Sequence, residues 1–537
     1  MQGSSLAVAI SGLVLFAATP LVAQVKPADQ GASAAPEMVH AQHPAEENKA
    51  SQRPVLLEGY GNGGFAISTK VPEAQAFFTN GMILGSAFAH KAAIAAMEEA
   101  VRLDPQCAMC LWGQAFMSGP TLNYGSDAKE RKPLLAMIKR ARKLAESGAT
   151  ASEKALIDAL AMRYQRGNVS KRDKDFALAM AALARFYPED DTVMVMAADA
   201  ALIAVSQEAE YPAAGKAAMA YLEPVLARNP TSTPAIHFYI HATEIAGEGA
   251  KAEPFADRLG GLAANASHLI HMPSHTWYWV GRYQDAANAN LRAVTIDEGN
   301  AARLGHTGHE GVFKLPYHAH NVIFGLGGAM MALDAQTALT LARPLVEVAQ
   351  ARTEAGPVMQ LLTAAGYFAS ARFETPEIVL ALTEPKLPYL KAAWHYARGE
   401  AFAARRDRAG LTAEIAAIPQ RIATGKIDDE TRAAEQMLGI TRAVLQGRLA
   451  VIEGRKSDAA AAFKAAAEIE ETPDFSRFTD PPAFWYPVRR DLAAALLAAG
   501  DRAGARRELQ ASLKLRPKDP AALILLREVE AGLQPAS

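Results

Sequence analysis

Histidine is concentrated in one part of this chain. Of its 13 histidines, nine fall between positions 237 and 320, far more than an even distribution over 537 residues would place there. Imidazole is the commonest side-chain ligand for transition metals, and it titrates near neutral pH without any perturbation by its surroundings. The segment therefore indicates metal binding or acid–base chemistry.

The first group of candidates lies in the string TPAIHFYIHATEIAG. Pro234 suits the first turn of a helix, and Gly247 suits its end. His237 and His241 are then one turn apart on one face, with Glu244 three residues further along the same stripe. This spacing lets two nitrogens hold a metal while the carboxylate acts as a third ligand, an orienting partner or a base.

A second group lies in HLIHMPSHTWYWVGRY, where Pro273 predicts that a helix begins close to it. His275 is then expected in the first turn of that helix, and His271 at or just before its start. We interpret Trp277 and Trp279 as packing residues rather than as a cage for a ligand.

A third group lies in LPYHAHNVIFGLGGAMMAL, where Pro316 again fits a first helical turn. Tyr317, His320 and Asn321 would then share one side of the helix, because they are three and four residues apart. His318 points elsewhere and is a weaker candidate.

Together these groups define the predicted site. The predicted metal ligands are five histidines from three helix starts, which are His237, His241, His271, His275 and His320. If the site also catalyses a reaction, Glu244 and Tyr317 are the expected catalytic groups. A nitrogen-rich set suits Zn, Cu, Fe or Ni and disfavours Mg and Ca, which prefer oxygen. The alternative is that each histidine only fills its own hydrogen-bonded place in the packing.

Cys107 and Cys110 are the only cysteines, and the pattern after Pro105 puts both in the first turn of a helix. The helix dipole there stabilises a thiolate. In an oxidising compartment the two sulfurs form a local disulfide or a redox pair, and otherwise they are small residues packed at a junction. Leu111, in place of a histidine, excludes the usual attachment of a c-type haem.

The elements that must position these residues are helices. Alanine dominates the apolar residues, and aromatic residues make up only 7% of the chain, which favours an all-α protein. In RRDLAAALLAAGDRAGARRELQASLKLRPKDPAALILLREVEAGL, apolar residues recur at spacings of three and four, and Gly500-Asp501 makes a turn. Comparable helix pairs begin near residue 72 and recur at 271–298, 390–418 and 439–470.

These helix pairs resemble the tetratricopeptide repeat, whose units stack into a superhelix with a concave groove. The resemblance implies an all-α solenoid of helical hairpins with a right-handed superhelical twist. The strings DPQCAMCLWGQAFMSGPTLN, HFYIH, HMPSH, GRYQDAANAN and YHAHN further resemble a group of exported bacterial tetratricopeptide-repeat proteins. That likeness implies the fold and one site built from the histidine strings, and it transfers no activity.

The chain is expected to have four parts. Residues 1–23 carry an apolar stretch and a small-residue end, which is typical of a signal peptide for export. Residues 24–69, rich in Ala, Pro, Gln and Glu, are predicted to be a disordered tether. The repeats then form an N-terminal block at 70–335, which carries the histidine site, and a C-terminal block at 336–537. We therefore expect a periplasmic or secreted protein, and this location makes copper and zinc the leading metals.

The overall charge limits the partners. Lys and Arg number 55 and Asp and Glu number 57, so the formal net charge is −2. A near-neutral chain removes the simplest argument for binding nucleic acid or an anionic membrane. No later apolar stretch reaches the length of about 18 residues that spans a bilayer, so we do not expect the mature chain to cross one.

Three functions are consistent with this sequence. The first is an exported repeat protein with a histidine-lined transition-metal site in its concave groove, which binds metal and is a candidate metalloenzyme whose reaction the sequence does not determine. The second is an interaction scaffold whose groove takes a peptide or a protein without any metal. The third is periplasmic storage or delivery of metal without chemistry.

Overall fold

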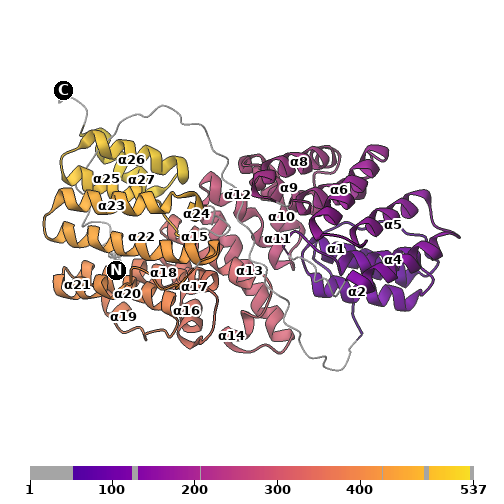
Figure 1. Ribbon diagram of the computed structural model, residues 1–537, viewed down its shortest axis with the longest axis horizontal. Helices are drawn as coiled ribbons and strands as arrows, with labels where there is room; N and C mark the ends of the chain where they lie inside the picture. The colour runs from indigo at the N-terminus through magenta and orange to yellow at the C-terminus, as the bar shows by residue number, and fades with distance from the viewer. Residues whose placement is uncertain (1–52, 124–130, 206, 426, 477–482, 533–537) are drawn as a thin grey trace, which may run out of the picture. The chain divides into compact units, whose positions relative to one another are not determined.

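The computed structural model describes residues 53–123, 131–205, 207–425, 427–476 and 483–532. The predicted signal peptide and most of the predicted tether lie outside these residues. Within them every element of secondary structure is helical (Figure 1), so the prediction of an all-α fold is confirmed. None of the described helices has the length and apolar character needed to cross a membrane.

The chain forms two compact units, which divide between Thr276 and Trp277. We call Ala34–Thr276 the N-terminal unit and Trp277–Ser537 the C-terminal unit. The helices of the N-terminal unit are α1 (Pro72–Ser86), α2 (His90–Leu103), α3 (Ala108–Met117), α4 (Arg131–Ala145), α5 (Ala151–Arg163), α6 (Val169–Phe186), α7 (Asp191–Ile203), α8 (Tyr211–Arg228), α9 (Thr233–Ile245), α10 (Glu253–Leu262) and α11 (Ser267–His271), with short 3₁₀ turns η2 (Glu208–Glu210) and η3 (Gly249–Ala252).

Consecutive helices of the N-terminal unit pack side by side as hairpins, and contacts also join α1 to α3, α3 to α5 and α7 to α9. Packing that is confined to near neighbours in the sequence is typical of a solenoid. In addition, α9 contacts α1, so the stack of helices curls back on its first hairpin. The histidines of α9 are thereby brought beside the end of α1.

The stretch that precedes α1 is packed against this unit. Asn80 exchanges two hydrogen bonds with the backbone of Leu57, at 3.0 and 2.7 Å. The backbone N–H of Asn62 donates to the hydroxyl of Thr233 at 2.9 Å, and Oδ1 of Asn62 accepts from the backbone N–H of Thr233 at 3.0 Å. The predicted tether is therefore wrong for residues 53–69. The segment lacks periodicity, as predicted, but its backbone finds partners on the helices and does not remain in solvent.

The C-terminal unit starts inside α12 (Pro273–Val280), at Trp277. It continues with α13 (Tyr283–Arg303), α14 (Gly308–Val312), α15 (His318–Ala332), α16 (Ala335–Ala351), α17 (Pro357–Thr363), α18 (Ala365–Phe373), α19 (Pro376–Leu380), α20 (Pro388–Ala404), α21 (Arg408–Ala417), α22 (Asp429–Ile452), α23 (Lys456–Glu470), α24 (Pro473–Ser476), α25 (Arg489–Ala498), α26 (Arg502–Leu515) and α27 (Pro520–Ala531). The predicted boundary between residues 335 and 336 does not divide the chain, because α15 packs against both α13 and α16.

Several hairpins of the C-terminal unit are joined by a tight turn with one residue in the left-handed conformation. Gly281 and Gly454 fill this position without strain, whereas Leu333 and Arg406 adopt it at a cost of about 1 to 2 kcal/mol each. Gly281 has a second constraint, because a side-chain carbon there would lie 2.1 Å from the carbonyl oxygen of Pro517.

That close approach joins the first and last hairpins of the C-terminal unit. The hydroxyl of Tyr283 donates to the carbonyl of Pro517 at 2.8 Å, and the hydroxyl of Tyr278 donates to the carbonyl of Trp485 at 3.0 Å. The guanidinium of Arg516 lies over the ring of Tyr278, 5.2 Å from its centre. This unit therefore also closes on its own first helices.

Candidate metal centre

Helix α9 presents the first two histidines as the sequence predicted. The hydroxyl of Ser232 accepts from the backbone N–H of Ala235, Pro234 lies in the first turn, and the helix ends at Ile245. His237 and His241 follow one turn apart on one face, and both are buried. The predicted start and spacing in this helix are confirmed.

A third imidazole reaches the same point from α11. The Nε2 atom of His237 lies 3.1 Å from Nε2 of His268 and 3.2 Å from Nε2 of His241. All three side chains are at most 5% exposed. His268 was not among the predicted ligands, and it completes a group of three side chains that could hold a metal ion.

The spacing of His268, His271 and His275 in the sequence could have predicted that His268 joins this group. They are three and four residues apart, as on one face of a continuous helix. We predicted that a helix begins at Pro273, and α12 does begin there, but the chain is already helical before it. Met272 between α11 and α12 keeps helical angles, with φ −48° and ψ −39°, so the three histidines continue one face.

The distances between the three nitrogens fit a metal ion. A tetrahedral ion with bonds of about 2.0 to 2.1 Å to imidazole holds its ligand nitrogens about 3.3 Å apart. Without an ion, the single lone pair on Nε2 of His237 accepts one N–H and cannot satisfy both of its neighbours. The three converging imidazole nitrogens are therefore arranged so that they could hold one cation.

The backbone sets the protonation of His237. Its Nδ1 lies 2.7 Å from the carbonyl oxygen of Ser86 and donates its hydrogen there, which leaves the lone pair on Nε2. Burial lowers the pKa of His237 to about 3, although the hydrogen bond to Ser86 acts in the opposite direction. The ring is consequently neutral at pH 7, which is the form that binds metals.

A second pair of imidazoles adjoins the first three. Nε2 of His271 lies 2.8 Å from Nε2 of His275, whose Nδ1 donates to Oε2 of Glu244 at 2.8 Å. The ring centres of His241 and His275 are 5.8 Å apart, and those of His268 and His271 are 5.7 Å apart. Five buried imidazoles thus form one continuous group. Glu244, a predicted catalytic residue, orients His275 within it.

Phe88 is packed among these rings. Its ring centre lies 4.4 Å from that of His237, 4.9 Å from that of His268 and 5.1 Å from that of His90. The residue occupies the turn between α1 and α2 with a φ of 57°, an unfavourable conformation for a bulky side chain. No motif in the sequence identified it.

A pocket of about 330 Å³ lies in the N-terminal unit, and Ser86, Phe88 and Phe238 are part of its wall. The first two of these also contact the imidazole of His237. Asp199 lies on the same wall, where burial raises its pKa to about 6 against the opposing charge of Arg163. A carboxyl group of this kind exchanges a proton near neutral pH, and the sequence had not singled it out.

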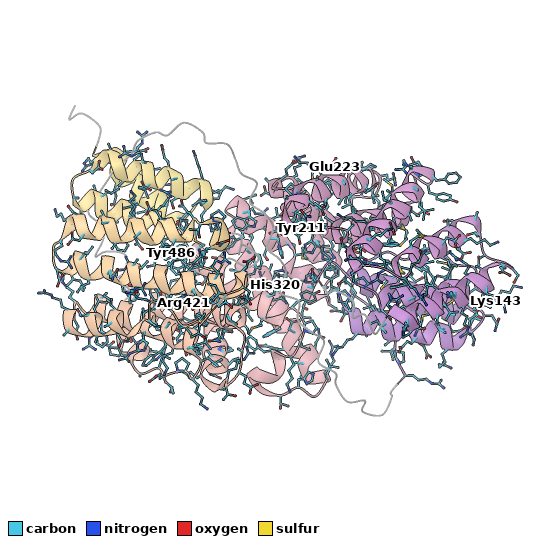
Figure 2. The ribbon with its side chains drawn as sticks, in the orientation of Figure 1. Lys143, Tyr211, Glu223, His320, Arg421 and Tyr486 are labelled. Atoms are coloured by element: carbon cyan, nitrogen blue, oxygen red, sulfur yellow. A yellow bond between two sulfur atoms is a disulfide. The ribbon has the colours of Figure 1, made fainter. Side chains whose placement is uncertain are left out.

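The other two predicted residues belong to the C-terminal unit. His320, labelled in Figure 2, lies on α15 with its ring 5.1 Å from that of Phe324. Tyr317 has a φ of 66° and precedes the helix, which begins at His318. The predicted helical turn at Pro316 is therefore wrong, and so is the predicted shared side of Tyr317 and His320. Their roles as a catalytic group and a ligand stay predictions.

His318, which was the weaker candidate for the site, pairs with a buried carboxylate. Its Nδ1 lies 3.2 Å from Oδ2 of Asp297, which also accepts from the side-chain amide of Asn321 at 2.9 Å. All three side chains are buried. This group joins α13 to α15 within the core of the C-terminal unit.

The two cysteines form a disulfide, the first of the forms that the sequence left open. Cys107 caps α3 and Cys110 lies in its first turn, with their Cα atoms 5.3 Å apart. Both are buried. They supply no thiolate to the histidine group.

No protein-family profile matches the chain, and no curated protein sequence matches it. Among solved structures, the human IFIT1 dimer with m7Gppp-AAAA is similar at 12% identity over 75% of this chain and 91% of its own, with a TM-score of 0.32. Yeast Tom70 is similar at 12% identity over 86% of this chain and 92% of its own, with a TM-score of 0.27. The TPR domain of P58(IPK) is similar at 13% identity over 80% and 98%, with a TM-score of 0.22. Similarities of this size carry no argument about function, and the fold rests on the helix packing described above.

Proposed function

We propose that this protein binds a transition-metal ion through the Nε2 atoms of His237, His241 and His268. The observation that carries the proposal is the convergence of three buried imidazole nitrogens, with separations of 3.1 and 3.2 Å from the central one. The hydrogen bond from His237 to Ser86 supports it, since it leaves the correct nitrogen of that ring available.

The ligand set favours zinc or copper over harder ions. Imidazole nitrogen suits Zn, Cu and Fe, whereas Mg and Ca require oxygen. The three proposed ligands are imidazole rings, and the nearby negative charge is that of Glu244, which accepts from His275. Export to an oxidising compartment makes copper and zinc the two ions to test first.

We extend the proposal to metal-dependent chemistry. Three protein ligands leave the fourth position of a tetrahedral ion open, as in catalytic zinc sites. An ion there would activate a bound water or polarise a substrate. Glu244 accepts the Nδ1 hydrogen of His275 and so fixes the orientation of that ring. Nε2 of His275 lies 2.8 Å from Nε2 of His271, so the two rings can hold or move a proton between them. Simple storage of metal has no need of such an ordered pair.

The metal content of the full-length protein, purified without a histidine tag, tests the first step. We expect about one ion per chain by mass spectrometry of the metal, and X-ray absorption with imidazole nitrogens at about 2.0 Å. His237→Ala and His268→Ala should each lower the affinity by at least about 100-fold, since each removes a ligand.

A matched control is His395→Ala, which removes a histidine that pairs with Glu414 at 2.6 Å in the C-terminal unit. This variant should keep the metal. A protein that is free of metal after growth with added zinc and copper, and that binds neither ion in a competition with a chelator, would contradict the proposal and favour the interaction scaffold.

We also propose that the protein is exported. The apolar segment within residues 1–23 supports this, as does the disulfide between Cys107 and Cys110, since such bonds persist in oxidising compartments. N-terminal sequencing of the mature protein should find a start close to residue 24. An intact Met1 in a protein that fractionates with the cytosol would exclude export.

A further inference from the structure

The C-terminal unit contains a pocket of about 190 Å³ whose wall is formed by α18, α20, α22, α25 and α27. The wall includes the rings of Phe368, Tyr396, Trp485 and Tyr486, the last of which is labelled in Figure 2. A cavity of about 150 Å³ accommodates benzene, so this pocket has room for an aromatic ring with a small substituent.

Arg372, on α18, brings an unbalanced positive charge to this wall. Among the described residues its Nε is buried without a hydrogen-bond partner, and no carboxylate forms an ion pair with it. Its guanidinium lies 5.8 Å from the centre of the Trp485 ring. Burial, together with the charges of Arg490 and Arg448, lowers the pKa of Arg372 to about 10, so it remains protonated at neutral pH.

Two of the three carboxylates of the same wall, Asp491 and Glu400, are engaged by other groups, and the third, Glu528, is exposed. Asp491 accepts from Arg448 at 3.1 Å and from the hydroxyl of Tyr486 at 2.6 Å. Glu400 accepts from Arg448 at 3.0 Å and from the hydroxyl of Tyr396 at 3.0 Å.

Three of the four arginines of this wall are at least partly buried, and the third of them is also paired; the fourth, Arg406, is exposed. Arg490 lies 3.3 Å from the buried carboxylate of Asp519. Arg372 is therefore the one arginine of these three, within the described residues, that has no acidic partner. A charge that is partly removed from water is costly unless it is paired, so a ligand that supplies one negative charge would stabilise this site.

We propose that this pocket binds a small monocarboxylate with an aromatic or branched apolar body, whose carboxylate pairs with Arg372. The planar guanidinium matches a carboxylate in a two-point hydrogen bond. The aromatic wall suits the apolar body. A phosphate is disfavoured, because a second negative charge would be repelled by Glu400 and Asp491.

Calorimetric titration of the full-length protein with benzoate, phenylacetate and isovalerate tests the proposal. We expect at least one of these acids to bind, and we expect Arg372→Gln to weaken that binding by about tenfold or more. Phenylacetamide has the same shape without the charge. It should bind to the wild type at least as weakly as the acids bind to Arg372→Gln. The matched control is Arg343→Gln, which removes an exposed arginine paired with Glu374 in the same unit and should leave binding unchanged.

Three results would overturn the proposal. They are no binding of any of the three acids at millimolar concentration, equal binding of phenylacetamide, and tighter binding of phenyl phosphate than of phenylacetate. The measurements do not depend on the metal, so they can fail while the proposed metal site stands.

A second measurement separates a ligand-binding arginine from a structural one. In the absence of ligand, Arg372→Met should raise the melting temperature, because it removes an unpaired charge and keeps the apolar stem. A melting temperature that falls by several degrees would mean that Arg372 stabilises the fold, and the proposal would then be wrong.

Discussion

Two histidines of the group, His237 and His275, are oriented by the partner of their Nδ1 atoms. His237 donates to the carbonyl of Ser86, and His275 donates to the carboxylate of Glu244. Each bond selects one tautomer and aims Nε2 at the neighbouring ring. Ser86 lies 151 residues before His237 in the chain, so spacing within the histidine-rich segment could not reveal this contact.

A pH dependence of stability is expected at Glu470, whose carboxylate accepts from the backbone N–H of Val488 at 2.8 Å. Burial raises the pKa of Glu470 from 4.5 to about 8, against the opposing effects of that hydrogen bond and of Arg516. The folded chain thus holds a proton that the unfolded chain has lost. Stability should therefore fall as the pH rises from 4.5 to about 8, by at most about 1.4 kcal/mol per pH unit for one group.

Glu470→Gln removes this titration and keeps a polar side chain. Urea unfolding across that pH range should show the variant gaining stability relative to the wild type as the pH rises. Glu468→Gln changes an exposed residue of the same helix and serves as the control. A difference between Glu470→Gln and the wild type that is constant with pH would contradict the prediction.

At the scale of elements, Pro234 predicted a helix start correctly, Pro273 begins α12 within a run that is already helical, and Pro316 failed. Pro234 and Pro273 lie in the first turns of α9 and α12. Pro316 precedes a left-handed Tyr317, and the helix begins only at His318. A proline restricts its own φ but not that of the next residue, so it cannot guarantee that the helix continues.

The turn at Gly281 provides a test of how the C-terminal unit closes. Gly281→Ala forces a side chain into a φ of 79° and against the carbonyl of Pro517, so we expect a loss of about 2 kcal/mol or more in the free energy of unfolding. Gly454→Ala occupies the equivalent turn with a φ of 74° and no atom within 4 Å, and it should cost about 1 kcal/mol. Equal losses in the two variants, measured by chemical unfolding, would show that the contact with Pro517 is unimportant.

The disulfide at the start of α3 should contribute modestly to stability. It closes a loop with a sequence separation of only 3 residues. The loop-entropy relation for so short a loop gives about 2 kcal/mol. Cys107→Ala with Cys110→Ala should lower the free energy of unfolding by about that amount and leave the metal content unchanged. Loss of the metal in a folded double variant would show that the disulfide is coupled to the histidine group.

At the scale of the whole molecule, the chain divides into two closed stacks, each with its own candidate site. The proposed metal ligands lie in the N-terminal unit, and the proposed carboxylate pocket lies in the C-terminal unit. Scanning calorimetry of the metal-free protein should resolve two transitions. Zinc or copper at about 100 times its dissociation constant should stabilise one of them by about 2.7 kcal/mol.

The other transition should respond to the carboxylate ligand and not to the metal. His237→Ala should abolish the response to metal, and Arg372→Gln should abolish the response to the carboxylate. A single transition that both ligands shift equally would show that the two stacks unfold as one cooperative unit.

Local sequence determined much of this protein. Apolar spacing and alanine content predicted helical hairpins, and histidine density located most of the group that now includes His237, His241, His271 and His275. These properties depend on residues three or four positions apart, which interact within one helix or hairpin.

Only the tertiary structure decided which distant residues meet. It placed His268 beside His237, Phe88 among the imidazoles, and Arg372 in a pocket without an acidic partner. It also packed residues 53–69 against the helices and moved the division of the chain to Thr276. The place of Phe88 beside the imidazoles of α9 follows from the closure of a stack of helices on its own beginning, and that closure depends on the sum of many small rotations between neighbouring hairpins. No local pattern in the sequence encodes such a sum.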